Sequence, residues 1–502
     1  MAVAPVTLSV DDDLRRRRLT VFFRILLAIP HFLWFIGWTF LVAVAAVIGW
    51  LVTVIAGRLP DSFHRFFCAY IRYSTHLFAY FFLVANPYPG FLGEAGSYPV
   101  DVELPPRAAQ SRLRVLVRLV LAIPALILSV ALASYVFTGS TSVTINHKRT
   151  TTGGGGSVTG LIAVVGFLGW FASLVTGRMP SGLRDAGGYT VGYRAQVLAY
   201  LLLVTERYPN SDPYAILSAV PSPPEHPVRL EGDSEVLRRS RITVFFRLPL
   251  LIPHLFWLYL WGILAAITVF LQWFVTLVAG RPARSFHRFL SRFVRYTFHV
   301  YAFGSLAANR FPGFVGAPGV YELDLVLPEP GRQNRWKTLF RLVLVVPAVI
   351  FSILLLWVLV ITAVFMWFTA LAIGRVPEGL RNLSAYALRY GAQLNAYYYL
   401  LTDVYPHASP LEGIAPVADE HDDRPFGGLP PPAPPAPPAP VSDAPSPWWA
   451  GPPAPGPEPS APAGGLAPVP AEPLAEPTEG PATPPGEHHP APPDEAHSTE
   501  DS

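Results

Sequence analysis

The sequence predicts an all-α integral membrane protein made of four repeated helical hairpins, with about eight spans, short strands outside the membrane and a disordered C-terminal tail. Of the 502 residues, 51% are hydrophobic and only 14% are charged, which is not the balance of a soluble chain. The apolar residues also gather in nearly charge-free runs that approach the roughly 20 residues a helix needs to cross hydrocarbon. These runs are 25–57, 119–137, 160–177, 248–280 and 342–374.

A Gly-Arg pair recurs four times and marks an internal repeat of about 94 residues. The first half aligns with the second at an offset of 223 residues, without a gap from Arg18 to Phe91. The predicted units are 1–94, 95–217 (with a polar insert at 138–160), 218–317 and 318–410, and the tail is 411–502. The markers of the repeat are the arginines of the four pairs and a tryptophan seven residues before each glycine: Arg58, Arg178, Arg281 and Arg375, with Trp50, Trp170, Trp273 and Trp367.

Each unit is expected to hold the same elements in the same order. It opens with an alternating apolar stretch, such as "PVTLSV" at 5–10 or "YPVDVEL" at 98–104, which predicts a strand. An arginine cluster, the apolar helix and the Gly-Arg pair follow. A second, more amphipathic helix then closes at a motif such as "NPYP" at 86–89, because the residue before a proline is pushed out of helical geometry.

The insert predicts where the apolar helices turn. Polar residues such as His147 and Lys148 cannot lie in lipid with an unpaired backbone, so the insertion point lies outside the hydrocarbon. That point aligns near Ala43 in the first unit. A single span from His31 to Ala56 would put Ala43 at the bilayer centre, so a hairpin turning there is favoured. The rival is one long span per unit, with the helix after the Gly-Arg pair as its return, and it also gives eight spans.

The charge is divided between the body and the tail. From Leu411 onward there are fifteen acidic residues and one basic residue, so the tail carries −14 and the rest of the chain carries +17. On the hairpin arrangement the opening arginines and the Gly-Arg pairs lie on one side, and the positive-inside rule makes that side the cytoplasm. We therefore expect a multi-pass protein of a bacterial inner membrane with both termini cytoplasmic. The excess of arginine is typical of any multispan protein and also fits contact with anionic lipid headgroups.

The tail predicts a disordered segment that a cytoplasmic protein partner binds. It holds about half of the 55 prolines and cannot bury a core. Trp448 and Trp449 are its exception and could dip into a membrane surface or dock on a partner.

A polar stripe on the second helix is the candidate functional feature. Arg72, His76 and Tyr80 are spaced i, i+4 and i+8 and so share a face. The counterparts are Arg295, His299 and Phe303; Arg389, Gln393 and Tyr397; and Gln196 and Tyr200, with Arg194 nearby. Four such stripes can line a transport path or a headgroup site. The structural interpretation, which we favour, is an in-plane helix whose arginines reach lipid phosphates.

No metal site or cofactor is expected. His31 and His254 follow prolines, and we expect them to satisfy a backbone carbonyl that the proline kink frees. Cys68 is the single cysteine, so neither a disulfide within the chain nor a multi-cysteine metal site can form.

The stretch "HPVRLEGDSEVLRRSRITVFFRLPLLIPHLFWLYLWG" at 226–262, with the landmarks "WFVTLVAGR", "RY" and "YP" or "FP", resembles a bacterial membrane family known as domain of unknown function 4389. The resemblance covers roughly residues 1–410 as four copies. It implies a multipass membrane protein and supplies no activity and no catalytic residues. The even units depart from the pattern, because they lack the Pro-His pair and the second carries the insert.

The leading functional hypothesis is a non-enzymatic, membrane-organising or lipid-interacting protein whose tail binds a partner, with no nucleic acid involved. The alternative is a transporter or channel, since parallel internal repeats are a known transporter design. A membrane enzyme comes third, because the sequence shows no paired carboxylates, nucleophile elbow or zinc-binding helix pattern.

Overall fold

The computed structural model describes residues 5–134, 142–145, 148–151, 160–218, 225–232 and 237–411. The predicted tail beyond residue 411, with Trp448 and Trp449, lies outside the described residues, as does most of the insert. Within the insert, strands β3 (Ser142–Ile145) and β4 (Lys148–Thr151) form an antiparallel pair.

Each unit folds into a long apolar helix followed by a 21-residue helix. In unit 1 a short helix α1 (Arg18–Phe22) leads into α2 (Arg24–Ala56), Gly57 ends α2 in the left-handed conformation, and α3 (Asp61–Phe81) follows. Only glycine adopts that conformation without strain, which is why the pair begins with glycine. Unit 3 repeats this order with α9 (Arg241–Phe245), α10 (Arg247–Ala279) and α11 (Arg284–Gly304).

The even units keep the same order with a broken first helix. Unit 2 has α4 (Arg112–Leu121), α5 (Ile123–Ala133), α6 (Leu161–Thr176), α7 (Ser181–Leu201) and α8 (Pro213–Ile216). Unit 4 has α12 (Arg335–Leu339), α13 (Arg341–Leu344), α14 (Val346–Ile373) and α15 (Glu378–Tyr398). We call α2, α5 with α6, α10 and α14 the outer helices, and α3, α7, α11 and α15 the inner helices.

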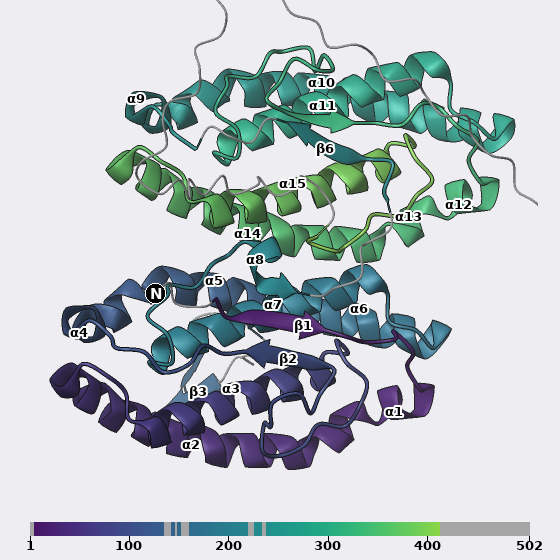
Figure 1. Ribbon diagram of the computed structural model, residues 1–502. Helices are drawn as coiled ribbons and strands as arrows, with labels where there is room; N and C mark the ends of the chain where they lie inside the picture. Colours follow the sequence, from purple (N-terminus) through teal and green to yellow (C-terminus); the bar gives the residue numbers. More distant parts are fainter. Residues whose placement is uncertain are drawn as a thin grey trace, which may run out of the picture. The chain divides into compact units, whose positions relative to one another are not determined.

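The predicted opening strands are present in all four units. Strands β1 (Thr7–Val10) and β2 (Val100–Glu103) pair antiparallel, and the short β5 (Leu217–Ser218) joins β1 in parallel, giving the order β2-β1-β5. Strands β6 (Arg229–Gly232) and β7 (Leu323–Val326) form the equivalent antiparallel pair of units 3 and 4. The strands pack against the inner helices, with β2 on α3, β1 on α7 and β7 on α11 (Figure 1).

Units pair reciprocally, 1 with 2 and 3 with 4. The N–H of Gln110 donates to the carbonyl of Gly57 at 2.8 Å, and the N–H of Arg16 donates to the carbonyl of Gly177 at 2.9 Å. The marker tryptophans follow the same rule, since Trp50 donates to Val115 and the equivalent Trp170 donates to Val21. Such reciprocal contacts are those of a twofold-symmetric dimer, here formed within one chain.

Units 3 and 4 repeat these contacts. The N–H groups of Gln333 and Arg239 donate to the carbonyls of Gly280 and Gly374, at 2.9 and 2.8 Å. The inner helices lie against each other in each pair, α3 on α7 and α11 on α15 (Figure 1).

Units 2 and 4 join the two pairs. Helix α14 packs on α5 and α6, the Asn382 amide donates to Asp212 at 2.9 Å, and the Tyr214 hydroxyl donates to the carbonyl of Leu411 at 2.7 Å. Two glycines allow the close approach. A methyl group added to Gly182 would lie 2.7 Å from the Ala408 nitrogen, and one added to Gly379 would meet residues 210–212.

The predicted hairpin turn near Ala43 is wrong. Helix α2 runs unbroken from Arg24 to Ala56, so Ala43 is an ordinary helical residue, and α10 is equally continuous. In unit 2 the chain leaves the helix at Ser134 and returns at Gly160, whose N–H donates to the Ser134 carbonyl at 2.9 Å. The polar insertion shows where the outer helix of unit 2 is interrupted, but it adds no helix-breaking residue to the other three units.

The Gly-Arg pair therefore lies about 50 Å from the opening arginines of its own unit, the length of a 33-residue helix. It meets the opening arginines of the paired unit instead. Among the described residues, three helices are long and apolar enough to cross a membrane, or four if the bent pair α4 and α5 counts as one. They are α2, α10 and residues 341–373, and they point to membrane association.

Candidate functional site

A buried arginine caps the end of every inner helix. Arg24 donates to the carbonyl of Tyr80 in the last turn of α3 and to that of Ala85 beyond it, and its guanidinium lies 4.3 Å from the Tyr80 ring centroid. The equivalent residues in the other units are Arg118, Arg247 and Arg341, each buried and each bonded to the same pair of carbonyl positions. We call these four the cap arginines. A cation at the carbonyl end of a helix is favourable because it meets both the unpaired carbonyls and the helix dipole.

Each cap closes around a leucine in the left-handed conformation, which costs a residue with a side chain about 1 kcal/mol or more. These are Leu83, Leu203, Leu306 and Leu400. The inner helices thus end several residues before the proline motifs that the sequence suggested as their stops.

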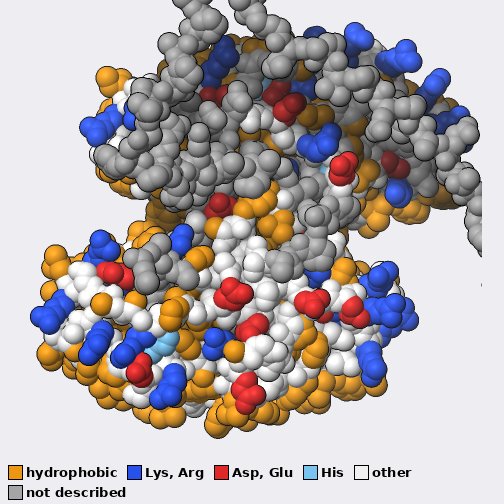
Figure 2. All heavy atoms as spheres, viewed as in Figure 1, with side chains coloured by type: hydrophobic (Ala, Val, Ile, Leu, Met, Phe, Trp, Pro, Cys, Tyr) orange, Lys and Arg blue, Asp and Glu red, His pale blue; other side chains and the backbone are white. Residues whose placement is uncertain are grey.

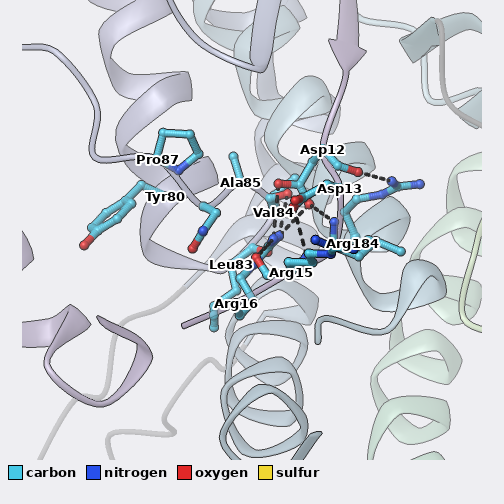
Figure 3. Close-up of polar contacts among 12 residues, drawn as sticks. Asp12, Asp13, Arg15, Arg16, Tyr80, Leu83, Val84, Ala85, Pro87 and Arg184 are labelled. Atoms are coloured by element: carbon cyan, nitrogen blue, oxygen red, sulfur yellow. Dashed lines mark hydrogen bonds and ion pairs between the residues drawn. The ribbon is translucent and has the colours of Figure 1, made fainter. Parts of the chain in front are cut away.

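A second side chain bonds each leucine carbonyl. In unit 1 it is Arg16, which donates to Leu83 at 2.8 Å and is neutralised by Asp12 at 2.7 Å (Figure 3). The equivalents are Gln110 on Leu203, Arg239 on Leu306 and Gln333 on Leu400.

The predicted stripe shares one face of each inner helix, and in the odd units that face meets an aspartate of the paired strand. His76 Nε2 lies 3.1 Å from Asp101 Oδ1, and the His76 ring stacks on Tyr98. Burial opposes ionisation of Asp101, but hydrogen bonds from His76, Gly96 and Val102 outweigh burial and hold its pKa below the ordinary value.

Unit 3 repeats this arrangement. His299 lies 2.8 Å from Asp324, which Arg295 also contacts at 3.2 Å. Here too the hydrogen bonds to the carboxylate lower the pKa of Asp324 despite its burial.

In the even units the stripe is neutral at the same position. The Gln196 amide donates to the carbonyl of Val6 at 2.7 Å and accepts the N–H of Asn210 at 2.8 Å. The Gln393 amide donates to Val228 at 3.2 Å and accepts the N–H of His407 at 2.9 Å.

The remaining stripe residues also contact protein. Arg194 lies over the Phe78 ring, Arg389 donates to the Ser409 carbonyl, and Arg72 is half-buried. Tyr80, Tyr200 and Tyr397 lie beneath the cap arginines. The structure thus places the stripe among contacts within each pair of units rather than on an outer surface, and His76, Arg295 and His299 are the members that meet an aspartate of the paired unit's strand.

The two proline-linked histidines contact tyrosines. His31 Nδ1 lies 3.1 Å from the Tyr73 hydroxyl, which donates to the His31 carbonyl at 3.0 Å. His254 Nδ1 lies 2.7 Å from Tyr296 in the same way. In unit 1 the Tyr73 hydroxyl, not the histidine side chain, is the group that bonds a carbonyl at the proline turn.

Sequence reasoning missed the most regular polar feature of the surface, which lies where paired units meet. The first arginine of each opening helix is exposed and reaches the Gly-Arg end of the paired unit's outer helix. Arg18 donates to the Val175 carbonyl at 2.9 Å, Arg241 to Ala372 at 3.0 Å and Arg335 to Val278 at 2.8 Å. In the fourth case a methyl group on Gly57 would lie 3.6 Å from Nε of Arg112.

We call each resulting pair of exposed arginines a corner. The four corners are Arg18 with Arg178, Arg112 with Arg58, Arg241 with Arg375, and Arg335 with Arg281. The second arginine of each corner makes no side-chain hydrogen bond or ion pair with the described residues. The next residue after the first arginine is a large apolar side chain with 70–73% of its surface exposed: Leu19, Leu113, Ile242 and Trp336. Figure 2 shows Lys and Arg side chains gathered at both ends of the N-terminal pair, with hydrophobic side chains along the edge that α2 forms.

Comparison with known proteins gives one match. The family model described as "Domain of unknown function (DUF4389)" matches residues 18–93, 156–211, 241–316 and 335–409, which together are more than half of the chain. Searches of curated proteins and of solved structures found no match.

Proposed function

The chain belongs to the DUF4389 domain family, and we propose that it is a non-enzymatic membrane protein that binds and organises lipid around its outer helices. The sequence expectation of a bacterial plasma membrane with cytoplasmic termini, and of a tail that binds a protein partner, is part of this proposal.

The uncovered apolar surface of the outer helices carries the proposal. Only 17% of the most apolar stretch of α2 and of α10 is buried, although these stretches hold almost no charge. Soluble monomers rarely leave contiguous apolar patches of more than a few hundred Å² uncovered. Lipid hydrocarbon chains can cover such a surface, so no further protein has to pack against these helices.

The corners supply the complementary polar contact. Each corner brings two exposed arginines to one junction between paired units, and guanidinium matches phosphate in geometry and charge. Each corner adjoins a highly exposed apolar side chain, so a phospholipid can place its phosphate on the arginines and its chains on the outer helix. This is why we assign the lipid contact to the corners and not to the buried stripe.

Spin-labelled lipids test the proposal directly. The full chain is reconstituted in vesicles, and the fraction of motionally restricted label is measured for phosphatidylcholine and for phosphatidylglycerol. We expect a restricted fraction with both labels and a preference for the anionic lipid. Replacing Arg58, Arg178, Arg281 and Arg375 by Gln should lower that preference about fivefold, while the phosphatidylcholine fraction stays the same.

A matched variant controls for net charge. Arg65, Arg284, Arg288 and Arg292 are exposed arginines on α3 and α11, and their replacement by Gln removes the same number of charges without changing a corner arginine. An equal loss of preference in both variants would contradict the role of the corners. A chain that restricts neither lipid is not embedded at all.

A transporter is the second candidate, and the buried His76–Asp101 and His299–Asp324 pairs favour it. They occupy equivalent places in the two pairs of units and join an acid to a titratable base, as proton-coupled paths do. Its test is ion or proton flux into proteoliposomes. Flux that disappears when His76 and His299 are replaced by Gln would put transport above lipid binding.

A further inference from the structure

We propose that the protein is embedded in one leaflet, with its outer helices lying along the membrane plane among the acyl chains and its strands in water. This inference rests on the proposed membrane function and specifies its geometry. It replaces the eight-span crossing that the sequence predicts.

The first argument is the path of the chain between units 1 and 2. The segment leaves the C-terminal end of α3 at Ala85, whose carbonyl accepts a hydrogen bond from Arg24. It reaches the opposite end at Gln110, which donates to Gly57 beside the start of α3. Residues 85–110 therefore cover the whole length of an inner helix of about 31 Å.

That segment is polar and open to its surroundings. Glu94, Ser97 and Glu103 are exposed, and most of the segment is irregular apart from strand β2. Irregular backbone that faces lipid does not occur within the hydrocarbon region, because its N–H and C=O groups find no partner there. A membrane crossed by α3 would force this segment through the hydrocarbon, and α2 packs along α3 and would cross with it.

The C-terminal pair of units repeats the path. Its segment runs from Ala308, bonded to Arg247, to Gln333, bonded to Gly280 at the other end of α11. Strand β7 lies within it and packs on α11. Figure 1 draws the strands β1, β2 and β6 in front of the inner helices, so in this view the strands of both pairs lie on the same side.

The insert gives an independent argument. It leaves the outer helix of unit 2 between Ser134 and Gly160, and the 16-residue helix α6 then leads to the Gly-Arg turn at Gly177. If that helix crossed a bilayer, a polar segment of more than 20 residues would start near the bilayer centre. An outer helix that lies along the membrane plane does not pass through the bilayer centre. An insert can therefore leave its middle directly toward the water.

The corners then fall in one layer. Each outer helix carries a corner at each end, because the reciprocal pairing brings opening arginines to the Gly-Arg turns. With the helices in plane, all four corners lie at the headgroup level of the same leaflet. Interfacial proteins commonly combine apolar burial with cationic contact to anionic lipid in this way.

Cysteine accessibility distinguishes the two geometries. Cys68 is buried and is replaced by Ala, and single cysteines are placed at Arg17, Ser62 and Ser97, all exposed. Arg17 precedes α1, which leads into the start of α2; Ser62 lies beyond the end of α2, and Ser97 lies on the polar segment between. Each variant is treated with a membrane-impermeant maleimide in right-side-out and in inside-out vesicles, and folding is checked by circular dichroism.

We expect all three cysteines to react in the same one of the two vesicle orientations. Reaction of Arg17→Cys and Ser62→Cys from opposite sides, with Ser97→Cys protected, would overturn the one-leaflet geometry. A spin label at Val47, exposed on α2, separates this outcome from failure of the membrane proposal itself. The label should be accessible to oxygen and shielded from water-soluble nickel in either geometry, and the reverse result means that α2 is not in lipid.

Discussion

The odd and even units build the same helix cap with different chemistry. In the even units a glutamine lies beside the cap arginine. Its oxygen accepts from the arginine, at 2.8 Å for Arg118 and 3.1 Å for Arg341, while its nitrogen donates to the left-handed leucine. In the odd units Arg16 and Arg239 take this place, so a second buried guanidinium group bonds the leucine carbonyl beside the cap arginine.

The difference teaches that one backbone geometry tolerates either a neutral bridge or a second cation, provided that acids are supplied for the cation. Arg16 is paired with Asp12, and Glu322 lies near Arg239. The stripe shows the same division, with His–Asp pairs in the odd units and glutamine–carbonyl bonds in the even units. An exchange between the two chemistries is therefore the sharpest way to test the comparison.

The largest effect is expected from Gln333→Arg, which gives unit 4 the odd-unit residue without an added acid. A second buried guanidinium beside Arg341 should lower the free energy of unfolding by roughly 3–5 kcal/mol. The reverse exchange, Arg239→Gln, should cost less than about 1 kcal/mol, because glutamine can bond Leu306 and accept from Arg247. Unfolding in detergent micelles, followed by tryptophan fluorescence, measures both. Equal costs would mean that the two chemistries are not distinct.

Acid should destabilise the pair of units 3 and 4 through two buried histidines, His226 of unit 3 and His407 of unit 4. His226 is only 4% exposed, and burial lowers its pKa to about 4, as it does that of His407, whose position in unit 2 is the uncharged Asn210. In the unfolded chain the histidine becomes protonated below about pH 6.5, whereas in the folded protein it stays neutral until a lower pH. The free energy of unfolding should therefore be full above pH 6.5 and fall by roughly 3 kcal/mol for His226 as the pH drops toward 4. The variant His226→Asn should lose the part of the pH dependence that His226 contributes, while His407 keeps its own. An unchanged slope would contradict the burial argument.

The contact between the even units depends on two glycines. Gly182→Ala places a methyl group against the backbone of Ala408 and should cost about 1–3 kcal/mol, since backbone cannot move aside as a side-chain end can. Gly379→Ala should cost less, because it first meets the side chain of Asn210. Gly391→Ala in the same helix α15 is the matched control, with nothing within 4 Å, and it should stabilise the helix by about 0.5–1 kcal/mol. A stabilised Gly182→Ala variant would show that units 2 and 4 do not pack as described.

Much of the fold follows from local sequence signals, and the rest depends on how units pair. The repeat, the opening strands and the two helices of each unit are predictable because alternation, apolar runs and the Gly57 turn are short-range patterns. The unbroken α2 is not, because the insert of unit 2 says nothing about Ala43. Leu83 in a left-handed turn carries no residue-type signal at all, since glycine is the usual residue there.

The corners show why the candidate site was only half predictable. Arg18, Arg112, Arg241 and Arg335 are retained at equivalent positions, each followed by a large apolar residue, and this signal is present in the sequence. That Arg112 lies beside Gly57 requires the reciprocal pairing, which only the three-dimensional structure supplies. The stripe was predicted as one face of a helix, but the strand that covers it lies in another unit.

The smallest effect is expected from His76→Gln, which tests whether His76 sets the pKa of Asp101 in the stripe of unit 1. The folded pKa of Asp101 lies below its ordinary value of 3.8, so its contribution to stability is present above that pH and is lost as the pH falls through the folded pKa. His76→Gln gives unit 1 the even-unit residue, which should cost about 1 kcal/mol at neutral pH and make the loss below pH 4 shallower, because a neutral amide stabilises the carboxylate less than histidine does. His64→Gln is the control on the same helix, where no aspartate is hydrogen-bonded to the ring. If both variants lose stability with acid as steeply as the parent protein, His76 does not set the pKa of Asp101. The odd and even stripes would then differ in residue type but not in how they stabilise a buried charge.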